Sequence, residues 1–201
     1  MRVLLIGSGA REHAIAEAFR RNKTVELFSY MKSKNPGIFS LSKNIEIGSY
    51  SDLEKIKKFA LKNEVELAFI GPEDPLSLGV VDALEHEGIN AVGPTKLMAR
   101  LETSKSFTRE LLQKYSIDGN PNFKVFNKNN SDEIKYFMNE LDAVVVKPDG
   151  LTGGKGVKVQ GDHFNTKKEA IDYCKEVLET HPAVIVEEKL DGEEFSLQCI
   201  T

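Results

Sequence analysis

Short apolar runs alternate with amphipathic stretches through the first hundred residues. The run Val3–Ile6 is continuously apolar, as in strands buried on both faces of a parallel sheet, and the other runs are mostly apolar. The runs lie at 3–6, 25–28, 65–70 and 89–92. Helices are predicted between them: Ala14, Ile15, Ala18 and Phe19 share one helical face, 51–54 has the sequence of a capping box, and 76–87 is amphipathic. This order predicts an α/β fold with a doubly wound, Rossmann-like parallel sheet, whose ligands bind at the carboxyl ends of the strands.

The pattern changes after Gly93-Pro94, where we place a domain boundary. Strands are predicted at 123–126, 143–147, 156–160 and 184–188, and helices at 96–102, 104–115, 132–141 and 166–179. The strands at 143–147 and 156–160 flank a glycine-rich turn and can pair as a hairpin. The sequence therefore predicts three parts: a substrate-binding domain at 1–94, a helical linker at 95–120, and a small α+β lobe at 121–201.

The last residues have the pattern of an incomplete strand. Phe195, Leu197 and Cys199 alternate with polar residues over 194–200, and the sequence stops at Thr201 without a turn or cap. An uncovered edge strand is a liability in a folded domain. We therefore expect that the sequence is cut within a domain.

Composition narrows the class of protein. With 27 Lys and Arg against 31 Asp and Glu, the net charge is −4, which argues against a broad nucleic-acid-binding surface. The two cysteines are not in a C-x-x-C pair, so neither a disulfide framework nor a zinc site is predicted. The first apolar run is too short for a signal peptide, and no stretch approaches the roughly 20 apolar residues that span a bilayer. We expect a cytoplasmic protein without a membrane partner.

Two turns at the predicted carboxyl edge carry candidate binding residues. Gly7-Ser8-Gly9-Ala10-Arg11-Glu12 joins the first strand to the first helix, where backbone amides favour an anion. The dinucleotide fingerprint needs a third glycine where Glu12 stands and an acidic residue where Ser29-Tyr30 stand, which disfavours NAD. Gly71-Pro72-Glu73 follows a later strand, and Glu73 can accept hydrogen bonds from a substrate. The alternative is that both segments are turns shaped by glycine and proline alone.

The strongest motif is the glycine-rich loop at 147–157. Four glycines and two lysines occupy ten residues between two predicted strands, so backbone amides and ammonium groups can surround a triphosphate. The Walker A pattern is absent. The segment 184–194 is an apolar strand that runs into an acidic turn, where backbone groups can bind adenine and a carboxylate can bind ribose. Its alternative is a solvated acidic turn, and that of the loop is a flexible hairpin.

Together these motifs resemble the phosphoribosylamine–glycine ligase (glycinamide ribonucleotide synthetase) family of the ATP-grasp superfamily. The matching segments are 7–13, 71–73, 93–95, 101–107, 146–151, 154–157 and 186–194. The resemblance implies that ATP, glycine and 5-phosphoribosylamine react to give glycinamide ribonucleotide, ADP and phosphate through a glycyl phosphate, a step of purine biosynthesis. Alignment and charge neutralisation supply most of such catalysis.

The resemblance also implies roles for individual residues. Lys147 and Lys155 would be catalytic. ATP would bind at Lys105, Lys147, Asp149, Gly150, Gly153, Gly154, Lys155, Gly156, Glu187, Glu188, Leu190 and Glu194. Phosphoribosylamine would bind at Gly7, Gly9, Arg11, Glu12, Gly71, Pro72 and Glu73. Two segments depart from the usual family pattern, Asn35-Pro36-Gly37-Ile38 in the first part and Thr152-Gly153 in the phosphate loop.

The resemblance implies that some of the binding residues belong to a second lobe that this sequence does not include. In this family the metal ligands for Mg²⁺ and the loop that receives glycine belong to a second lobe, so no metal-binding residue is predicted in these 201 residues. We expect the chain alone to be inactive, with the C-terminal half as a possible second chain. The alternatives are a non-catalytic nucleotide-binding module, and another ATP-grasp ligase such as a carboxylase that acts on bicarbonate.

Overall fold

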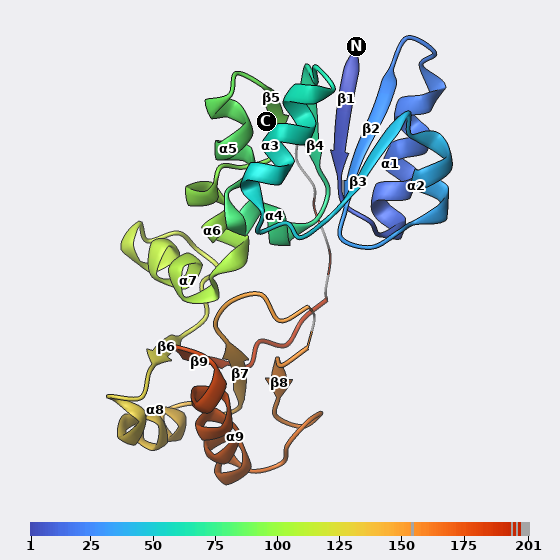
Figure 1. Cartoon of the computed structure of the whole chain (residues 1–201). Coiled ribbons are helices and arrows are strands. Elements are labelled where there is room, and N and C mark those ends of the chain that lie inside the picture. The colour runs from blue at the N-terminus through green and yellow to red at the C-terminus, as the bar shows by residue number, and fades with distance from the viewer. Residues whose placement is uncertain (154, 194, 196, 198–201) are drawn as a thin grey trace. The chain divides into compact units, whose positions relative to one another are not determined.

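The computed structural model describes residues 1–153, 155–193, 195 and 197, which fall into two compact units, Met1–Thr103 and Ser104–Thr201 (Figure 1). The first unit contains a five-stranded parallel sheet with the strand order β3-β2-β1-β4-β5. Its strands are β1 (Arg2–Ile6), β2 (Glu26–Met31), β3 (Asn44–Ile47), β4 (Leu67–Ile70) and β5 (Asn90–Val92). Its helices are α1 (Ala10–Arg21), α2 (Pro36–Leu41), α3 (Leu53–Lys62), α4 (Glu73–Leu78), α5 (Val80–His86) and α6 (Lys96–Thr103).

The sheet of the first unit is buried on both faces. Successive side chains of β1 point to opposite faces, so Leu4 and Ile6 pack in a core with α3 and α5, while Val3 and Leu5 pack in a core with α1 and α2. Burial on both faces explains why Val3–Ile6 of β1 and Leu67–Ile70 of β4 are continuously apolar. The predicted doubly wound fold is confirmed.

Three local predictions for this unit were incomplete or wrong. The strand β3 and the helix α2 were not predicted, so the sheet has five strands rather than four. The single helix expected at 76–87 is two helices, because Gly79 between them has φ of +87°. The cap of α3 is Asp52, which accepts from the Lys55 N–H at 3.0 Å, rather than a box that begins at Ser51.

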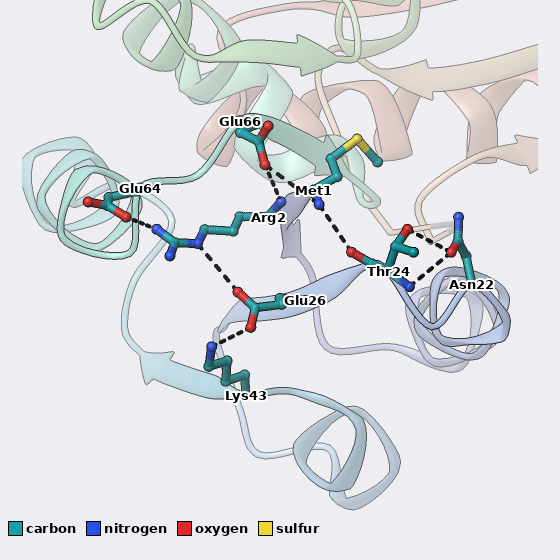
Figure 2. A network of polar contacts seen from close by, with 8 residues as sticks. All are labelled: Met1, Arg2, Asn22, Thr24, Glu26, Lys43, Glu64 and Glu66. Carbon is teal, nitrogen blue, oxygen red and sulfur yellow. Dashed lines mark hydrogen bonds and ion pairs between the residues drawn. The ribbon is translucent and has the colours of Figure 1, made fainter.

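A polar network lies at the amino-terminal ends of β1 and β2 (Figure 2). Arg2 pairs with Glu26 and Glu64, and Glu26 also pairs with Lys43. All four side chains are more than a third exposed, and exposed ion pairs add little to stability. The two apolar faces of the sheet, rather than this network, therefore stabilise the unit.

The second unit contains a four-stranded antiparallel sheet with the strand order β6-β9-β7-β8. Its elements are α7 (Lys105–Lys114), β6 (Phe123–Phe126), the 3₁₀ turn η1 (Ser131–Glu133), α8 (Ile134–Asn139), β7 (Val144–Pro148), β8 (Lys158–Val159), α9 (Lys167–Thr180) and β9 (Val184–Glu188). The predicted hairpin is confirmed, since Val145 of β7 pairs with Val159 of β8. The strand expected at 194–200 falls largely on residues outside the described part of the chain.

The two faces of this sheet differ in chemistry. Val144 and Val146 of β7, with Val184 and Val186 of β9, pack in an apolar core with α8 and α9. The alternate positions belong to the other face, where Val145 lies opposite Glu187 and Lys147 lies opposite Ile185. The register of β7 and β9 thus places Lys147 and Glu187 on the same face, away from the apolar core.

Candidate functional site

The turn after β1 is organised around the buried side chain of Glu12. Its Oε2 accepts from the Gly9 N–H at 2.7 Å and its Oε1 accepts from Arg11 Nε at 3.2 Å, while only 5% of the side chain is exposed. Gly9 is the N-cap of α1, so Glu12 lies at the third helical position and satisfies an amide that the helix leaves unpaired. A carboxylate of the chain itself thus occupies the N-terminal amide that was predicted to be open to a phosphate.

Glycine is needed at positions next to the Glu12 carboxylate because the Glu12 side chain fills the space that a Cβ would occupy. A Cβ at Gly7 or at Gly71 would overlap the Glu12 side chain, and Gly7 also has φ of +143°. Glu12 stands where the dinucleotide fingerprint has its third glycine. Gly7 and Gly71, which lie in two different turns, therefore make room for a side chain and not only for a ligand.

Arg11 joins the turn after β1 to the turn after β4. Its Nη2 donates to the Gly71 carbonyl at 2.9 Å and to Glu73 Oε1 at 3.2 Å. The hydrogen bond to Glu12, and then the bond to Glu73, raise the pKa of the Arg11 guanidinium against the effect of burial. The structure thus brings together Arg11, Glu12 and Glu73, while Pro72 contributes as the N-cap of α4.

Sequence reasoning missed Asn35 as a structural contact of this edge. Its Nδ2 donates to the Ser8 carbonyl at 3.1 Å and the Gly9 carbonyl at 3.3 Å, and its Oδ1 accepts from two amides at the start of α2. Asn followed by Pro is a sequence signal for a helix N-terminus, so the signal was present. A cavity of about 190 Å³ lies on the same unit, and its lining residues are Lys32, Ser49, Tyr50, Ser51, Asp74, Ser77 and Leu78.

The second unit buries a carboxylate between two cations. Glu187 on β9, 3% exposed, accepts from Arg109 Nε at 2.7 Å, from Arg109 Nη2 at 3.1 Å and from Lys147 Nζ at 2.5 Å. Burial alone would raise the pKa of Glu187, but the hydrogen bonds from Arg109 and Lys147 outweigh it and the pKa is lowered. Glu187 is therefore ionised, and the three side chains carry one net positive charge.

These three side chains border a cavity of about 400 Å³. Its walls come from α7, from β7, β8 and β9, and from the segment after β9. The lining residues are Arg109, Pro121, Val145, Lys147, Val157, Val159, Asp162, Glu187, Glu188, Lys189, Leu190, Asp191 and Gly192. Four predicted nucleotide-binding residues thus lie around one cavity with both apolar and charged lining residues: Lys147, Glu187, Glu188 and Leu190.

Asp149 anchors the start of the glycine-rich loop to α7. Its carboxylate accepts from the Ser106 N–H at 3.2 Å, from Ser106 Oγ at 2.5 Å and from the Gly150 N–H at 3.0 Å. Lys105 Nζ donates to the Gly150 carbonyl at 2.7 Å. Gly150, Gly153 and Gly156 have positive φ values, which explains why glycine stands at these three positions.

Lys155 lies apart from the cavity that Lys147 borders. With Gly156 it lines a different cavity of about 560 Å³ beside α9, where Tyr173 Oη donates to the Gly156 carbonyl at 2.7 Å. Among the cavities described for residues 1–153, 155–193, 195 and 197, the two predicted catalytic lysines line different ones. Gly154 and Glu194, both predicted to bind ATP, lie outside the described residues.

Two absences concern the described part of the chain, residues 1–153, 155–193, 195 and 197. It contains no group of three or more His, Cys, Asp or Glu side chains that could hold a metal ion. It also contains no helix with the length and apolar composition that crossing a bilayer requires.

The fold and the loop between β7 and β8 define a class, the ATP-grasp proteins with a preceding doubly wound domain. Family models of phosphoribosylglycinamide synthetase match the chain twice, its N domain at residues 1–102 and its ATP-grasp (A) domain at residues 103–201. The chain belongs to the phosphoribosylglycinamide synthetase family. The family resemblance drawn from the sequence motifs is confirmed.

Similar proteins agree with this assignment. Phosphoribosylamine–glycine ligase of Methanococcus maripaludis is 51% identical over 98% of this chain and 46% of its own length. The crystal structure of the Thermotoga maritima enzyme of that name superposes with a TM-score of 0.72 at 28% identity, over 96% of this chain and 45% of the other. An ADP complex of N5-carboxyaminoimidazole ribonucleotide synthetase shares the fold, with a TM-score of 0.71 at 15% identity over 94% and 47%. The chain spans about half the length of the curated relatives it matches.

Proposed function

We propose that this chain takes part in the ATP-dependent ligation of glycine to 5-phosphoribosylamine, which gives glycinamide ribonucleotide, ADP and phosphate in purine biosynthesis. The observation that carries the proposal is the cavity of the second unit, which is lined by both apolar and charged side chains and bordered by a net positive cluster at Arg109, Lys147 and Glu187. The family match and the name of the Methanococcus relative supply the reaction.

In this proposal the cavity of the second unit holds the nucleotide. Glu187, Glu188 and Leu190 border the adenine, Lys147 and Lys105 contact phosphate oxygens, and the loop 149–156 covers them. Glu194 would hold the ribose. Lys155 lines the cavity beside α9 in this structure, and in this proposal the loop rearranges when Lys155 contacts phosphate. A loop with three glycines at positive φ has the backbone freedom for such a change.

We propose that phosphoribosylamine binds at the carboxyl edge of the first sheet. The edge presents Gly7, Gly9, Arg11 and Glu73, and the Glu73 carboxylate is 45% exposed and available to an amine or a hydroxyl. Glu12 is fully engaged within the turn, so its proposed part is to hold Gly9 and Arg11 in position.

The glycyl phosphate chemistry of the proposal places little demand on proton transfer. The glycine carboxylate attacks the γ-phosphate, and the amine of phosphoribosylamine then displaces phosphate from the glycyl phosphate. Cations that neutralise phosphate charge and side chains that align the reactants supply the catalysis. Mg²⁺ is part of the proposal through its preference for phosphate oxygens. Because the described residues contain no suitable ligand group, no step is assigned to a metal held by them.

The test is ADP formation from ATP, Mg²⁺, glycine and freshly generated phosphoribosylamine. This chain and the longest protein that its reading frame encodes are assayed side by side. We expect turnover by the long form that requires both substrates, and little or none by the 201-residue chain, because relatives use about twice this length. ADP release that ignores glycine would contradict the ligase proposal, and bicarbonate dependence in its place would favour a carboxylase. Turnover by the short chain would disprove the need for a second half.

A further inference from the structure

The cluster at Glu187 has more positive charge than ion pairing requires. A single cation would neutralise the carboxylate, yet Arg109 and Lys147 both contact Glu187 Oε2, at 3.1 Å and 2.5 Å. Arg109 also contacts Oε1 at 2.7 Å, so it alone makes a two-pronged contact. The second cation therefore calls for a separate explanation.

We propose that Arg109 is a positioning residue for Lys147. It keeps the buried Glu187 carboxylate paired, which allows the Lys147 ammonium to leave Glu187 and contact a phosphate oxygen of the bound nucleotide. The inference rests on the proposed nucleotide binding and adds to it a residue that neither the motifs nor the family resemblance assigned.

The cost of an unpaired buried charge is the physical basis. Glu187 is 3% exposed, and taking away the only partner of a buried carboxylate is strongly unfavourable. If Lys147 were that only partner, any nucleotide phosphate would have to compensate this cost. With the Arg109 fork in place, Glu187 keeps two hydrogen bonds when Lys147 turns away. The nucleotide then gains the lysine contact at a smaller cost.

The side chains of Arg109 and Lys147 are suited to different roles. A guanidinium is a rigid fork that matches a carboxylate, whereas an ammonium is a point charge on a flexible stem. Arg109 is also fixed from a second side: Asn120 Nδ2 donates to the Arg109 carbonyl at 3.1 Å, and Arg109 Nη1 donates to Asn120 Oδ1 at 3.4 Å. Both cations are about one-fifth exposed at the cavity. We therefore infer that Arg109 stays on Glu187, while Lys147 moves to the phosphate.

Calorimetric titration with ADP and with adenosine tests this assignment on the longest protein that the reading frame encodes. Adenosine lacks phosphate, so only ADP should report on Lys147. We expect Arg109→Met to weaken ADP binding about ten-fold and adenosine binding less than about two-fold. Arg109→Lys, which keeps the charge without the fork, should lie between. Lys114→Met, at the exposed end of the same helix, should bind both ligands as the unaltered protein does.

A double-mutant cycle separates positioning from mere stability of the fold. If Arg109 acts through Lys147, Arg109→Met added to Lys147→Met should cause little further loss of ADP affinity. Equal losses for adenosine and ADP, or losses that add in the double variant, would overturn the inference. Arg109→Lys provides the same comparison if Arg109→Met does not fold. Failure of the unaltered protein to bind ADP would instead disprove the proposed nucleotide site, and the inference with it.

Discussion

Glu12 in the first unit and Glu187 in the second are both buried, with 5% and 3% of their side chains exposed, but they are held in opposite ways. Glu12 bonds to residues one and three positions away in the sequence. Glu187 bonds to residues 40 and 78 positions away. The first carboxylate belongs to a local capping motif, and the second joins a helix and two strands. The contacts of Glu187 form only when the whole second unit is folded. Loss of its charge should therefore lower the stability of the whole unit.

The partners differ in exposure as well as in distance along the chain. The Arg11 side chain is 59% exposed, so water screens its pairing with Glu12. Arg109 and Lys147 are 22% and 21% exposed, where screening is weaker. Changes at the Glu187 cluster should therefore destabilise more than matched changes at Glu12.

The largest effect is expected from Glu187→Gln. The substitution leaves two partly buried cations beside each other without a counter-charge, which should cost about 3 kcal/mol of unfolding free energy, the low end for a broken buried pair. Hydrogen exchange of the β7 and β9 amides measures this loss of stability within the second unit. Glu133→Gln, in an exposed pair with Lys124, is the control and should change little. Similar exchange in the two variants would contradict the importance of the cluster.

Acid should remove part of the same stabilisation without a mutation. The pKa of Glu187 in the folded chain lies below its ordinary value of 4.5, so its contribution is present above that value and is lost as the pH falls through the lower folded value. We expect the protection of β7 and β9 amides to decrease below about pH 4.5 in the unaltered chain. The decrease should be smaller in Glu187→Gln. The same pH dependence in both would show that another group is responsible.

In the first unit, Gly71→Ala tests how tightly Glu12 is packed. The new Cβ would overlap the Glu12 side chain, which is buried and held by two hydrogen bonds, so we expect a loss of about 2 kcal/mol. Denaturant unfolding, monitored by exchange of the β1 and β4 amides, measures the loss. Gly192→Ala is the matched control, because a Cβ there meets nothing within 4 Å. A neutral Gly71→Ala would mean that Glu12 can move away.

The smallest effect is expected from Arg11→Met. Because the guanidinium is mostly exposed, its loss should cost about 0.5 kcal/mol of stability. Arg109→Met, the matched change in the second unit, should cost clearly more. If the two variants lose equal stability, the distinction between the local and the non-local carboxylate is wrong.

The sequence was most informative where burial imposes a simple pattern. Residues Val3–Ile6 of β1 and all of β4 are apolar because both faces of the sheet are covered, and so these strands were predicted. The strand β3 was missed because Asn44–Ile47 is only four residues long, is half exposed at the sheet edge and lacks an apolar run. The break between α4 and α5 was missed because apolar positions continue in phase across Gly79.

For the candidate site, motifs revealed the residue types but not their partners. Lys147 and Glu187 were predicted from the loop and strand in which they stand. Arg109 was missed because an arginine within an amphipathic helix looks like any other exposed charge. Its contact with Glu187 depends on how α7 packs against the sheet, which no local pattern encodes. That Lys155 and Lys147 line different cavities likewise depends on the path of the loop, not on its composition.

The register of β7 against β9 also limits how this segment can change in evolution. One extra residue inserted ahead of Lys147 in β7 would reverse the facing of every side chain that follows it in the strand. The ammonium would then enter the apolar core beneath α8 and α9, and a valine would replace it at the cavity. Insertions and deletions should therefore be absent from β7, whereas the polar loop at 127–130 should vary freely in length.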